Sequence, residues 1–478
     1  MATVGTWVRR GLLGALALVV VIVAAAIGFL LYKQIPQNAS GWAAKAVCSG
    51  AWVAGRDPDV IFEEDVVGVS VAFKAVSVTI DEANHSVTAR TAGLFPRTAT
   101  LQGERGCVLD LPANPEAEPY VPGTDTSATW PKGDLPLGEA DWPAGVDVAE
   151  LNSVVDDAFV GAGDDTAANA RGVAVVQDGR ILVLREASGF EGGTPLFGWS
   201  MTKTVAGMLA YKLLSENSVS LDTPVVDTFR AGREPAWVAD WRTDDRSSIT
   251  VRQVFAMTDG LANVEGYSPF SDTVAMLNVE PDMAEFAASA QAEYPPGTRF
   301  NFTSQTANIL AAISRGQLAT DEEYWSYPYK ALFDPIGATS ATLESDTSGT
   351  WVGSSYLWAD LADWARLGQL GLQDGEWDGK QVLPPGWLDL ASTQTLPQGE
   401  GAGYSAQVWL PGDPVGGECR NLPGFPEDMV AMEGHWGQKV AMVPSKNAVV
   451  VRLGWTYDSD QFDSCTFWND VLAALPTP

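Results

Sequence analysis

A serine and a lysine three residues apart, at the start of an apolar helix-forming run, constrain this chain more than any other feature. The stretch 197–206 has the sequence FGWSMTKTVA, and the apolar run continues through residues 213–214. Residues i and i+3 lie on one helix face, so the Lys203 amine can reach the Ser200 hydroxyl. A serine hydroxyl needs a base to take its proton, and a lysine can be that base only when burial lowers its pKa. We therefore predict that Ser200 is a nucleophile and that Lys203 is its base.

An uncharged apolar run, residues 11–32, begins directly after Arg9 and Arg10. Its length suits one membrane crossing, and the preceding arginines favour a cytoplasmic N-terminus. We expect residues 1–10 to be a cytoplasmic tail and residues 11–32 a single-pass anchor in the cell membrane. The rest of the chain would then lie on the extracytoplasmic side, periplasmic or extracellular. A cleaved signal peptide ending near Ala24-Ala25-Ala26 is the alternative, although the apolar run continues beyond it.

The four cysteines agree with export, because an even number in an oxidising compartment suggests disulfides. Three connectivities are available, and pairing by neighbourhood, Cys48–Cys107 and Cys419–Cys465, is the most economical. The chain has two histidines and no CxxC pair, so we expect no metal site. No dinucleotide or Walker loop stands in a strand–helix context, so we expect no organic cofactor either.

The net charge of −31 makes nucleic acid and anionic lipid surfaces poor partners for this chain. The acidic residues are spread along the sequence, which is typical of a solubilising surface. We expect a small-molecule or peptide substrate, and a membrane contact only through the N-terminal helix.

Three segments follow the apolar run. Residues 33–113 are predicted to form a small β-rich region, with strands at 66–71, 75–80 and 86–90. Residues 114–146 are rich in Pro, Gly and acidic residues, which is typical of a linker wrapping a larger domain. Residues 147–478 form the main domain.

The main domain has strands at both ends and helices in the middle. Residues 173–176 and 181–184 flank Asp178-Gly179, which is a strong hairpin signal. Strands at 440–443 and 448–453 stand near the other end, between predicted helices at 148–159 and 467–475. We therefore predict an α+β or α/β fold: an antiparallel sheet flanked by helices and completed by both ends of the domain, with an inserted, mainly helical domain. The helices expected in the middle lie at 251–255, 273–277, 283–292, 306–316 and 359–371.

Several short motifs occur in an order that resembles the serine β-lactamase and penicillin-binding-protein superfamily. Within it, the chain is most similar to class C β-lactamases, the esterases related to them and 6-aminohexanoate-dimer hydrolase. The resemblance runs from about residue 168 to the C-terminus. Its motifs are SMTK at 200–203, ITVR at 249–252, MTDGL at 257–261, YPPGTRF at 294–300, GSSY at 353–356, DWARLG at 363–368 and GHWGQ at 434–438.

The resemblance implies that Ser200 is acylated and that Lys203 accepts its proton. It also implies an oxyanion hole made by the N–H groups of Ser200 and Gln438. The family's third motif lies on the terminal strand edge, where a small residue lets substrate approach the backbone. His435, Trp436 and Gly437 occupy that motif here, and we expect them to contact substrate. Ser304 stands in the second motif, where it could offer a hydroxyl to substrate or cap a helix.

One position departs from the family pattern. Phe302 stands where a tyrosine usually relays protons, so the ring is kept, still lining the substrate pocket, and the hydroxyl is lost. A positioned general acid or base contributes about 10²–10⁴ in rate. Lys203 could work alone, Tyr267 in a nearby loop could replace the hydroxyl, or catalysis could be lost. Tyr267 could equally be an ordinary packed loop residue.

Two functions follow. The first is a membrane-anchored serine hydrolase that cleaves an ester or amide through an acyl-enzyme on Ser200. The second is a catalytically impaired relative that binds peptidoglycan-like peptides or regulates a partner. A Ser-His-Asp triad is disfavoured, since Ser200 is not in a G-x-S-x-G elbow and only His85 and His435 are available. His85 follows Asn84 and is expected to be a solvated turn residue.

Overall fold

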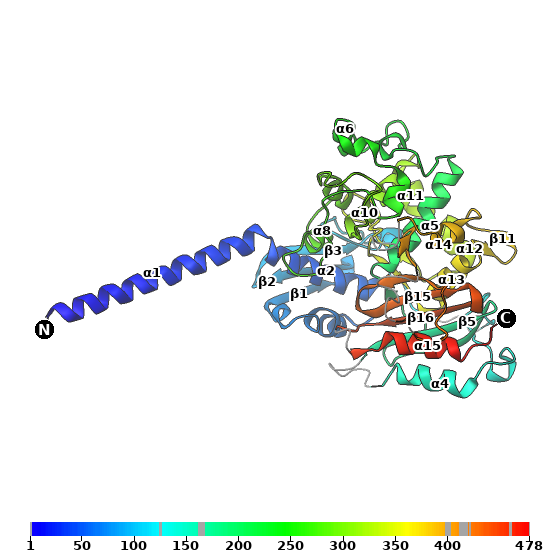
Figure 1. The fold of residues 1–478 in the computed structure, drawn as a ribbon. Helices are drawn as coiled ribbons and strands as arrows, with labels where there is room; N and C mark the ends of the chain where they lie inside the picture. Colours follow the sequence, from blue (N-terminus) through cyan, green and yellow to red (C-terminus); the bar gives the residue numbers. More distant parts are fainter. Residues whose placement is uncertain are drawn as a thin grey trace.

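The computed structural model describes residues 2–123, 127–160, 168–396, 403–410, 419, 422–457 and 461–477 (Figure 1). For residues 2–11 and 26 it describes the backbone alone. The expected cytoplasmic tail, the linker and the main domain each include some residues that lie outside this description.

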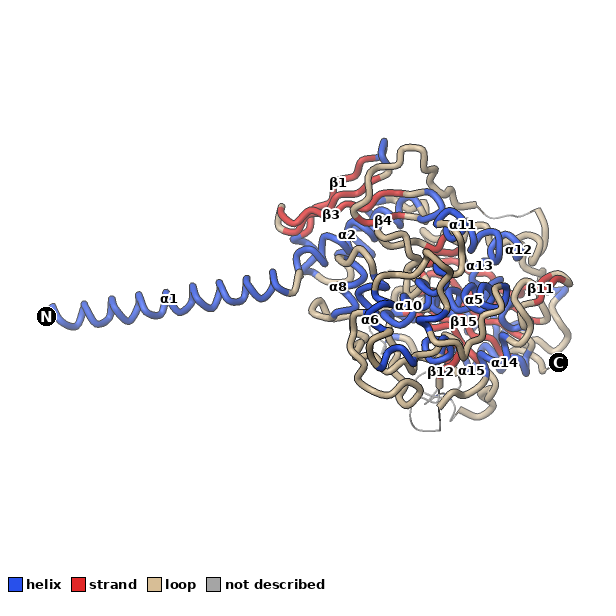
Figure 2. The backbone as a smooth tube through the Cα atoms, turned by 90° about the horizontal axis from the view of Figure 1, so that it is seen from above, coloured by secondary structure: helices blue, strands red, loops and turns tan. Residues whose placement is uncertain are grey.

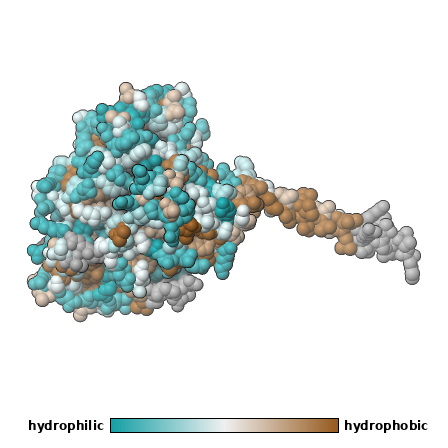
Figure 3. Space-filling model, turned by 180° about the vertical axis from the view of Figure 1, so that it is seen from behind, coloured by the Kyte–Doolittle hydropathy of each residue, from teal (hydrophilic) through white to brown (hydrophobic). Residues whose placement is uncertain are grey.

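Helix α1 (Ala2–Tyr32) projects away from the body of the molecule (Figure 1). Its segment Leu12–Tyr32, 21 residues long, has the length and apolar composition of a membrane span or a signal sequence, and none of it is buried against the protein. The space-filling view shows this helix as an apolar rod beside a mostly hydrophilic body (Figure 3). The helix runs through most of the expected tail, so the described tail is not a separate coil.

The N-terminal region consists of one long helix against a small antiparallel sheet. Helix α2 (Ile35–Trp52) packs on the sheet β1-β2-β3-β4, and the Cys48–Cys107 disulfide joins the helix to the last strand. Figure 2 shows this sheet at the edge of the molecule, next to the base of α1. The strands are β1 (Val76–Asp81), β2 (Ser86–Thr91), β3 (Leu94–Leu101) and β4 (Cys107–Leu109).

The strand predicted at 66–71 is wrong. Helix α3 (Pro58–Ile61) is followed by a π-helical turn over Phe62–Val67 and a 3₁₀ turn over Val71–Ala75. The reason is electrostatic. The helical turn brings Asp65 into the interior, where it binds Arg56 and Arg171, and such a buried carboxylate requires these partners. The strand was predicted from the β-branched residues at 66–71, and these do not indicate that Asp65 needs buried partners.

The predicted antiparallel sheet of the main domain is confirmed, with the order β12-β13-β14-β15-β16-β5-β6. Strand β16 pairs with β5, so the two ends of the domain complete one sheet. The predicted hairpin turn has φ of 51° at Asp178 and 69° at Gly179, as a type I′ turn requires. The strands are β5 (Ala170–Gln177), β6 (Arg180–Glu186), β12 (Tyr404–Ser405), β13 (Val408–Trp409), β14 (Val430–Gly434), β15 (Gln438–Val443) and β16 (Ala448–Gly454).

Alternate residues of the central strands face two separate cores. Ala174 and Val176 pack with helices α5 (Met201–Glu216) and α13 (Leu361–Leu372), whereas Val173 and Val175 pack with α4 (Val148–Asp157) and α15 (Ser464–Ala473). This alternation follows from the two-residue period of a strand. Figure 1 shows α4 and α15 covering one face of the sheet. The Cys419–Cys465 disulfide, as expected, ties α15 to the segment before β14.

The helical part lies between β6 and β12 and is interrupted by two small sheets. The predicted helices are present, and the one expected at 283–292 ends earlier, at residue 288. The small sheets have the orders β7-β9-β8 and β10-β11. The elements are α6 (Trp237–Trp241), α7 (Val251–Phe255), α8 (Asp272–Asn278), α9 (Met283–Ala288), α10 (Ser304–Gly316), α11 (Asp321–Pro328), α12 (Asp334–Ile336), α14 (Trp387–Ser392), β7 (Leu196–Phe197), β8 (Thr342–Leu343), β9 (Leu357–Ala359), β10 (Glu376–Trp377) and β11 (Lys380–Gln381).

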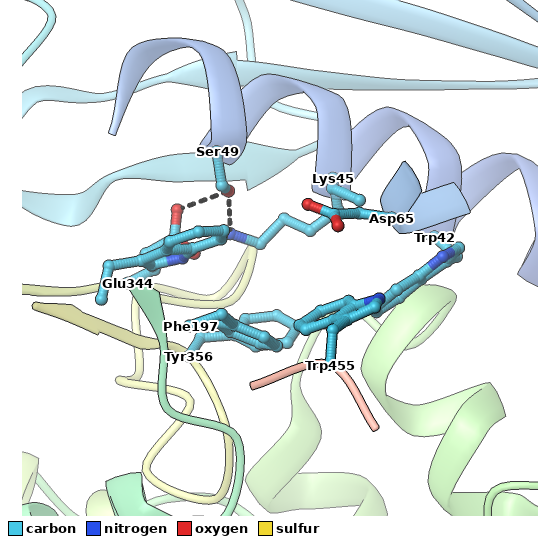
Figure 4. A pocket seen from close by; sticks show the side chains of 10 residues that line it. Trp42, Lys45, Ser49, Asp65, Phe197, Glu344, Tyr356 and Trp455 are labelled. Carbon is cyan, nitrogen blue, oxygen red and sulfur yellow. Dashed lines mark hydrogen bonds and ion pairs between the residues drawn. The ribbon is translucent and has the colours of Figure 1, made fainter. Parts of the chain in front are cut away.

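The N-terminal region is held to the main domain by buried charges. Lys45 of α2 forms an ion pair with Glu344, and Ser49 donates to the same carboxylate at 2.8 Å (Figure 4). A water-sized cavity of about 20 Å³ lies at this interface, lined also by Trp42, Asp65, Phe197, Tyr356 and Trp455. The interface shares one apolar core with residues beside Ser200, so the two regions form a continuous structure.

Candidate active site

The turn between β7 and α5 presents Ser200. Ser200 occupies the N-cap position of α5, and 7% of its surface is exposed. Trp199 directly before it has a φ of 48°, in the left-handed region that bulky residues rarely adopt. Gly198 N–H donates to the Leu357 carbonyl at 2.9 Å, which ties this turn to β9. The nucleophile candidate therefore stands on a strained turn that its neighbours hold in place.

Lys203 reaches Ser200 as the sequence predicted. The Nζ of Lys203 lies 2.8 Å from Ser200 Oγ, and it also donates to Ser304 Oγ and to the Ser354 carbonyl at 3.1 Å each. The lysine is buried, and burial lowers its pKa from 10.5 to about 8, against an opposing effect of Glu265. Among the described residues, no carboxylate lies in ion-pair contact with this amine. Such an amine can lose its proton near neutral pH.

Glu265 is the site residue that the sequence did not predict. Its carboxylate accepts from Ser304 N–H at 2.7 Å and from Ser304 Oγ at 2.9 Å. Ser304 thus connects Glu265 to Lys203, and it is fully buried. The helix cap is Thr303, which accepts from Thr306 N–H. A single acid in a loop has no pattern that could have revealed this role.

Tyr267 is brought to the nucleophile. Its phenol lies close enough to Ser200, Glu265 and Ser304 for each of them to affect its pKa. Burial and the negative charge of Glu265 raise the phenol's pKa, so the hydroxyl keeps its proton at neutral pH. The Tyr267 ring stacks on the His435 ring with centroids 4.0 Å apart and an interplanar angle of 11°. Tyr267 therefore packs against His435 and also lies near Ser200.

Phe302 occupies the position beside the lysine without a hydroxyl. Its ring lies 4.7 Å from Lys203 Nζ and packs against Tyr404 and Trp409. The ring keeps the apolar surroundings that lower the lysine's pKa, whereas a phenol hydroxyl near Ser200 comes from Tyr267. The family that the chain resembles has one tyrosine at this place. Here Phe302 supplies the ring beside Lys203, and Tyr267 supplies a hydroxyl near Ser200.

The third motif lies in a turn and not on the strand itself. Residues His435–Gly437 form a 3₁₀ turn, and β15 begins at Gln438, opposite Gly434 in the sheet. A Cβ at Gly434 would overlap the Gly198 carbonyl oxygen, so Gly434 allows the turn to approach the nucleophile. Gly437 has a φ of 81°, which favours glycine, and a Cβ there would overlap the Arg452 guanidinium. Backbone conformation and this close contact therefore both require glycine at position 437. Burial lowers the pKa of His435 to about 4, which leaves its ring neutral.

The N-terminal region contributes to the wall of the site. The Trp42 ring of α2 stacks on Trp199, with centroids 5.4 Å apart and an angle of 17°. The Trp436 ring also contacts Trp199, edge to face, with ring centroids 5.2 Å apart. The residue before the nucleophile is therefore fixed by aromatic rings from both ends of the chain.

His85 is remote from these groups in the fold. It ends the turn between β1 and β2 with a φ of 44°, and its ring packs 5.6 Å from Trp52. The expected turn position is confirmed, although the ring is partly covered and not free in solvent. The geometry therefore gives Ser200 a lysine and a tyrosine as neighbours, not a Ser-His-Asp triad.

Solved structures and a known family share this architecture. A Bacillus anthracis protein described as a 6-aminohexanoate-dimer hydrolase matches with a TM-score of 0.54 and 22% identity, over 68% of this chain and 83% of that one. A family VIII carboxylesterase matches with a TM-score of 0.51 and 13% identity, over 69% and 98% of the two chains. No curated protein matches. Residues 155–464 match the β-lactamase family, and this chain belongs to that family.

Proposed function

We propose that this protein is a membrane-anchored serine hydrolase that cleaves an ester or amide through an acyl-enzyme on Ser200. The observation that carries the proposal is the 2.8 Å contact between Ser200 Oγ and the buried Lys203 amine, whose pKa of about 8 makes a neutral amine accessible. The family and its hydrolase-containing fold support the general reaction class. The lysine's role as base and the anchoring by α1 belong to the proposal.

In the proposed first step, neutral Lys203 Nζ takes the hydroxyl proton as Ser200 Oγ bonds to the substrate's carbonyl carbon. The N–H groups of Ser200 and Gln438 hold the carbonyl oxygen as it becomes an oxyanion. The C–O or C–N bond of the substrate then breaks, and the leaving group receives a proton. Water attacks the acyl-enzyme in the second step, which releases the acid and restores the Ser200 hydroxyl. His435, Trp436 and Phe302 would line the substrate's path.

Tyr267 is the proposed carrier of the proton to the leaving group. Its hydroxyl is protonated at neutral pH and lies near Ser200. Glu265 connects to the lysine through Ser304, and its charge raises the pKa of the Tyr267 phenol. This arrangement replaces the hydroxyl that Phe302 lacks.

A fluorophosphonate probe tests the nucleophile. We expect labelling of the full chain and none of Ser200→Ala, with both proteins folded by circular dichroism. A folded wild type that is never labelled, and that hydrolyses no ester, would favour the catalytically impaired binder instead.

A pair of variants tests the tyrosine. Tyr267→Phe should lower ester turnover by about 10²–10⁴, the usual contribution of a positioned acid or base. Phe302→Tyr should change turnover much less, because Tyr267 already supplies a hydroxyl. A large gain in Phe302→Tyr with little loss in Tyr267→Phe would reverse these assignments.

A further inference from the structure

The loop that carries Glu265 and Tyr267 has apolar residues on its outer side. We call residues 264–271 the tyrosine loop. Val264 is 66% exposed and Phe270 is 46% exposed, whereas Glu265 and Tyr267 between them face Ser304 and Ser200. Exposed apolar side chains beside an active site indicate a surface that meets another apolar phase.

This loop touches the base of α1. The ring centroids of Phe29 and Phe270 lie 5.8 Å apart, and Lys33 Nζ lies 3.9 Å from an Asp272 carboxylate oxygen. Figures 1 and 2 both show α8, which follows the loop, next to the point where α1 leaves the body. Two contacts, one apolar and one ionic, therefore hold the tyrosine loop at the end of the apolar helix.

The position along α1 gives the depth of the loop in a bilayer. Tyr32 is 80% exposed, and Tyr32-Lys33 end the apolar segment with residue types that favour the membrane–water interface. Phe29 lies about 6 Å further toward the hydrocarbon, at 1.5 Å per residue. Phe270, in contact with Phe29, reaches the same layer. Tyr267 is three residues away, or at most about 10 Å of chain.

We propose that the tyrosine loop rests in the interfacial layer of the bilayer and that the substrate is an amphiphile, an ester or amide whose acyl chain lies in the membrane. The substrate part of this proposal rests on the hydrolase function, whereas the position of the loop does not. Contact through Val264 and Phe270 is apolar, which suits a chain of net charge −31 that anionic lipid would repel. The loop then brings Tyr267 and Ser200 to the layer where such a carbonyl group lies.

Fluorescence quenching tests the position of the loop. The four native cysteines form two disulfides, so Phe270→Cys introduces a single reactive thiol for an NBD label. In the full chain in phosphatidylcholine nanodiscs, we expect doxyl-labelled lipid to quench this label strongly. Lys380→Cys in the exposed β11 hairpin is the control and should remain unquenched. Equal, weak quenching at both positions would overturn the proposal.

Two esters, one that lies in a membrane and one that is soluble, test the substrate class. We expect Phe270→Asp to lower hydrolysis of a long-chain ester in phosphatidylcholine vesicles at least tenfold, and that of a soluble acetate ester less than twofold. Val160→Asp replaces an exposed valine just after α4, away from the tyrosine loop in the sequence, and should change neither rate. Equal losses on both substrates, or no loss on either, would reject the membrane-borne substrate. A wild type inactive on both esters and unlabelled by fluorophosphonate would remove the hydrolase function, while the quenching result still decides the position of the loop.

Discussion

Two buried lysines of this molecule have nearly the same neighbours, and we propose different roles for them. Lys203 on α5 contacts Ser200 at 2.8 Å and the Phe302 ring at 4.7 Å, and Lys45 on α2 contacts Ser49 at 3.0 Å and the Tyr356 ring at 4.6 Å. The difference is a carboxylate. Lys45 forms an ion pair with Glu344, whereas Lys203 meets only hydroxyl and carbonyl oxygens.

The Glu344 carboxylate stabilises the charged form of Lys45, and Lys203 has no such ion pair among the described residues. Glu344 also accepts from Cys107 N–H at 2.7 Å and from Trp358 Nε1 at 2.9 Å, so each oxygen of this buried carboxylate has two partners. Burial lowers the pKa of both lysines, but at Lys45 the charge of Glu344 opposes the shift in direct contact. We therefore propose that Lys203 can act as a base because no carboxylate among the described residues forms an ion pair with it.

Lys203→Met should have the largest effect on activity. We expect ester turnover to fall about 10⁴-fold, because methionine fills the space without accepting a proton. The melting temperature should stay unchanged or rise, because the buried amine is replaced by an apolar group. Turnover assays and thermal unfolding of the same sample measure both. Turnover within tenfold of wild type would remove Lys203 as the base.

Lys45→Met is the matched control and should have the opposite outcome. Removing one partner of a buried ion pair costs about 3–5 kcal/mol, because Glu344 is left without its counter-charge. Activity per folded molecule should change only a few-fold. Urea unfolding, together with titration of reactive Ser200, measures the two quantities. If stability were unaffected and activity lost, the contrast between the two lysines would be wrong.

The pH dependence should follow Lys203. With a pKa of about 8, the neutral amine increases about tenfold between pH 7 and pH 9, and kcat/KM should rise accordingly. Between pH 8 and 10.5 the unfolded lysine binds more protons than the folded one, so this group's contribution to stability increases with pH. Lys203→Met should abolish that contribution while Lys45→Met keeps it. A pH-independent rate over this range would contradict the assignment.

Glu265→Gln should have the smallest effect and sharpens the comparison. The charge of Glu265 raises the pKa of Lys203, so its removal should move the midpoint of the pH–rate profile to lower pH. The amide can still accept from Ser304, which should preserve the geometry. A pH–rate profile with Glu265→Asp as the conservative control measures the shift. A midpoint that moves upward would show that Glu265 acts through packing and not through charge.

Much of the fold could be predicted because its signals are local. The Asp178-Gly179 turn and the alternating apolar residues of the end strands report periods and backbone angles that neighbouring residues set. The π-helical turn around Asp65 could not be predicted in this way, since its partners Arg56 and Arg171 are nine and more than a hundred residues away. Long-range electrostatics overrode the local β preference there.

The candidate site also has a part that local spacing predicts and a part that depends on long-range contacts. Ser200 and Lys203 share one helix turn, so their spacing alone predicted their contact. Tyr267 was a candidate and lies near Ser200, whereas Glu265 was not predicted, and Ser304, expected to meet substrate or cap a helix, bonds Lys203 and Glu265. Tyr267, Glu265 and Ser304 come together only where the tyrosine loop meets the start of α10.

The sequence by itself determined a nucleophile–amine pair on an apolar helix, an apolar N-terminal segment and the sheet completed by both ends of the main domain. Helical and strand periods are short-range properties, so they can be recognised within a dozen residues. Only the tertiary structure decided that, among the described residues, one buried lysine has a carboxylate in direct contact and the other has none. It also decided that Trp42 supports the nucleophile turn and that Phe270 meets the base of α1. Desolvation and charge pairing depend on every group within a few ångströms, and the folded chain alone determines which groups those are.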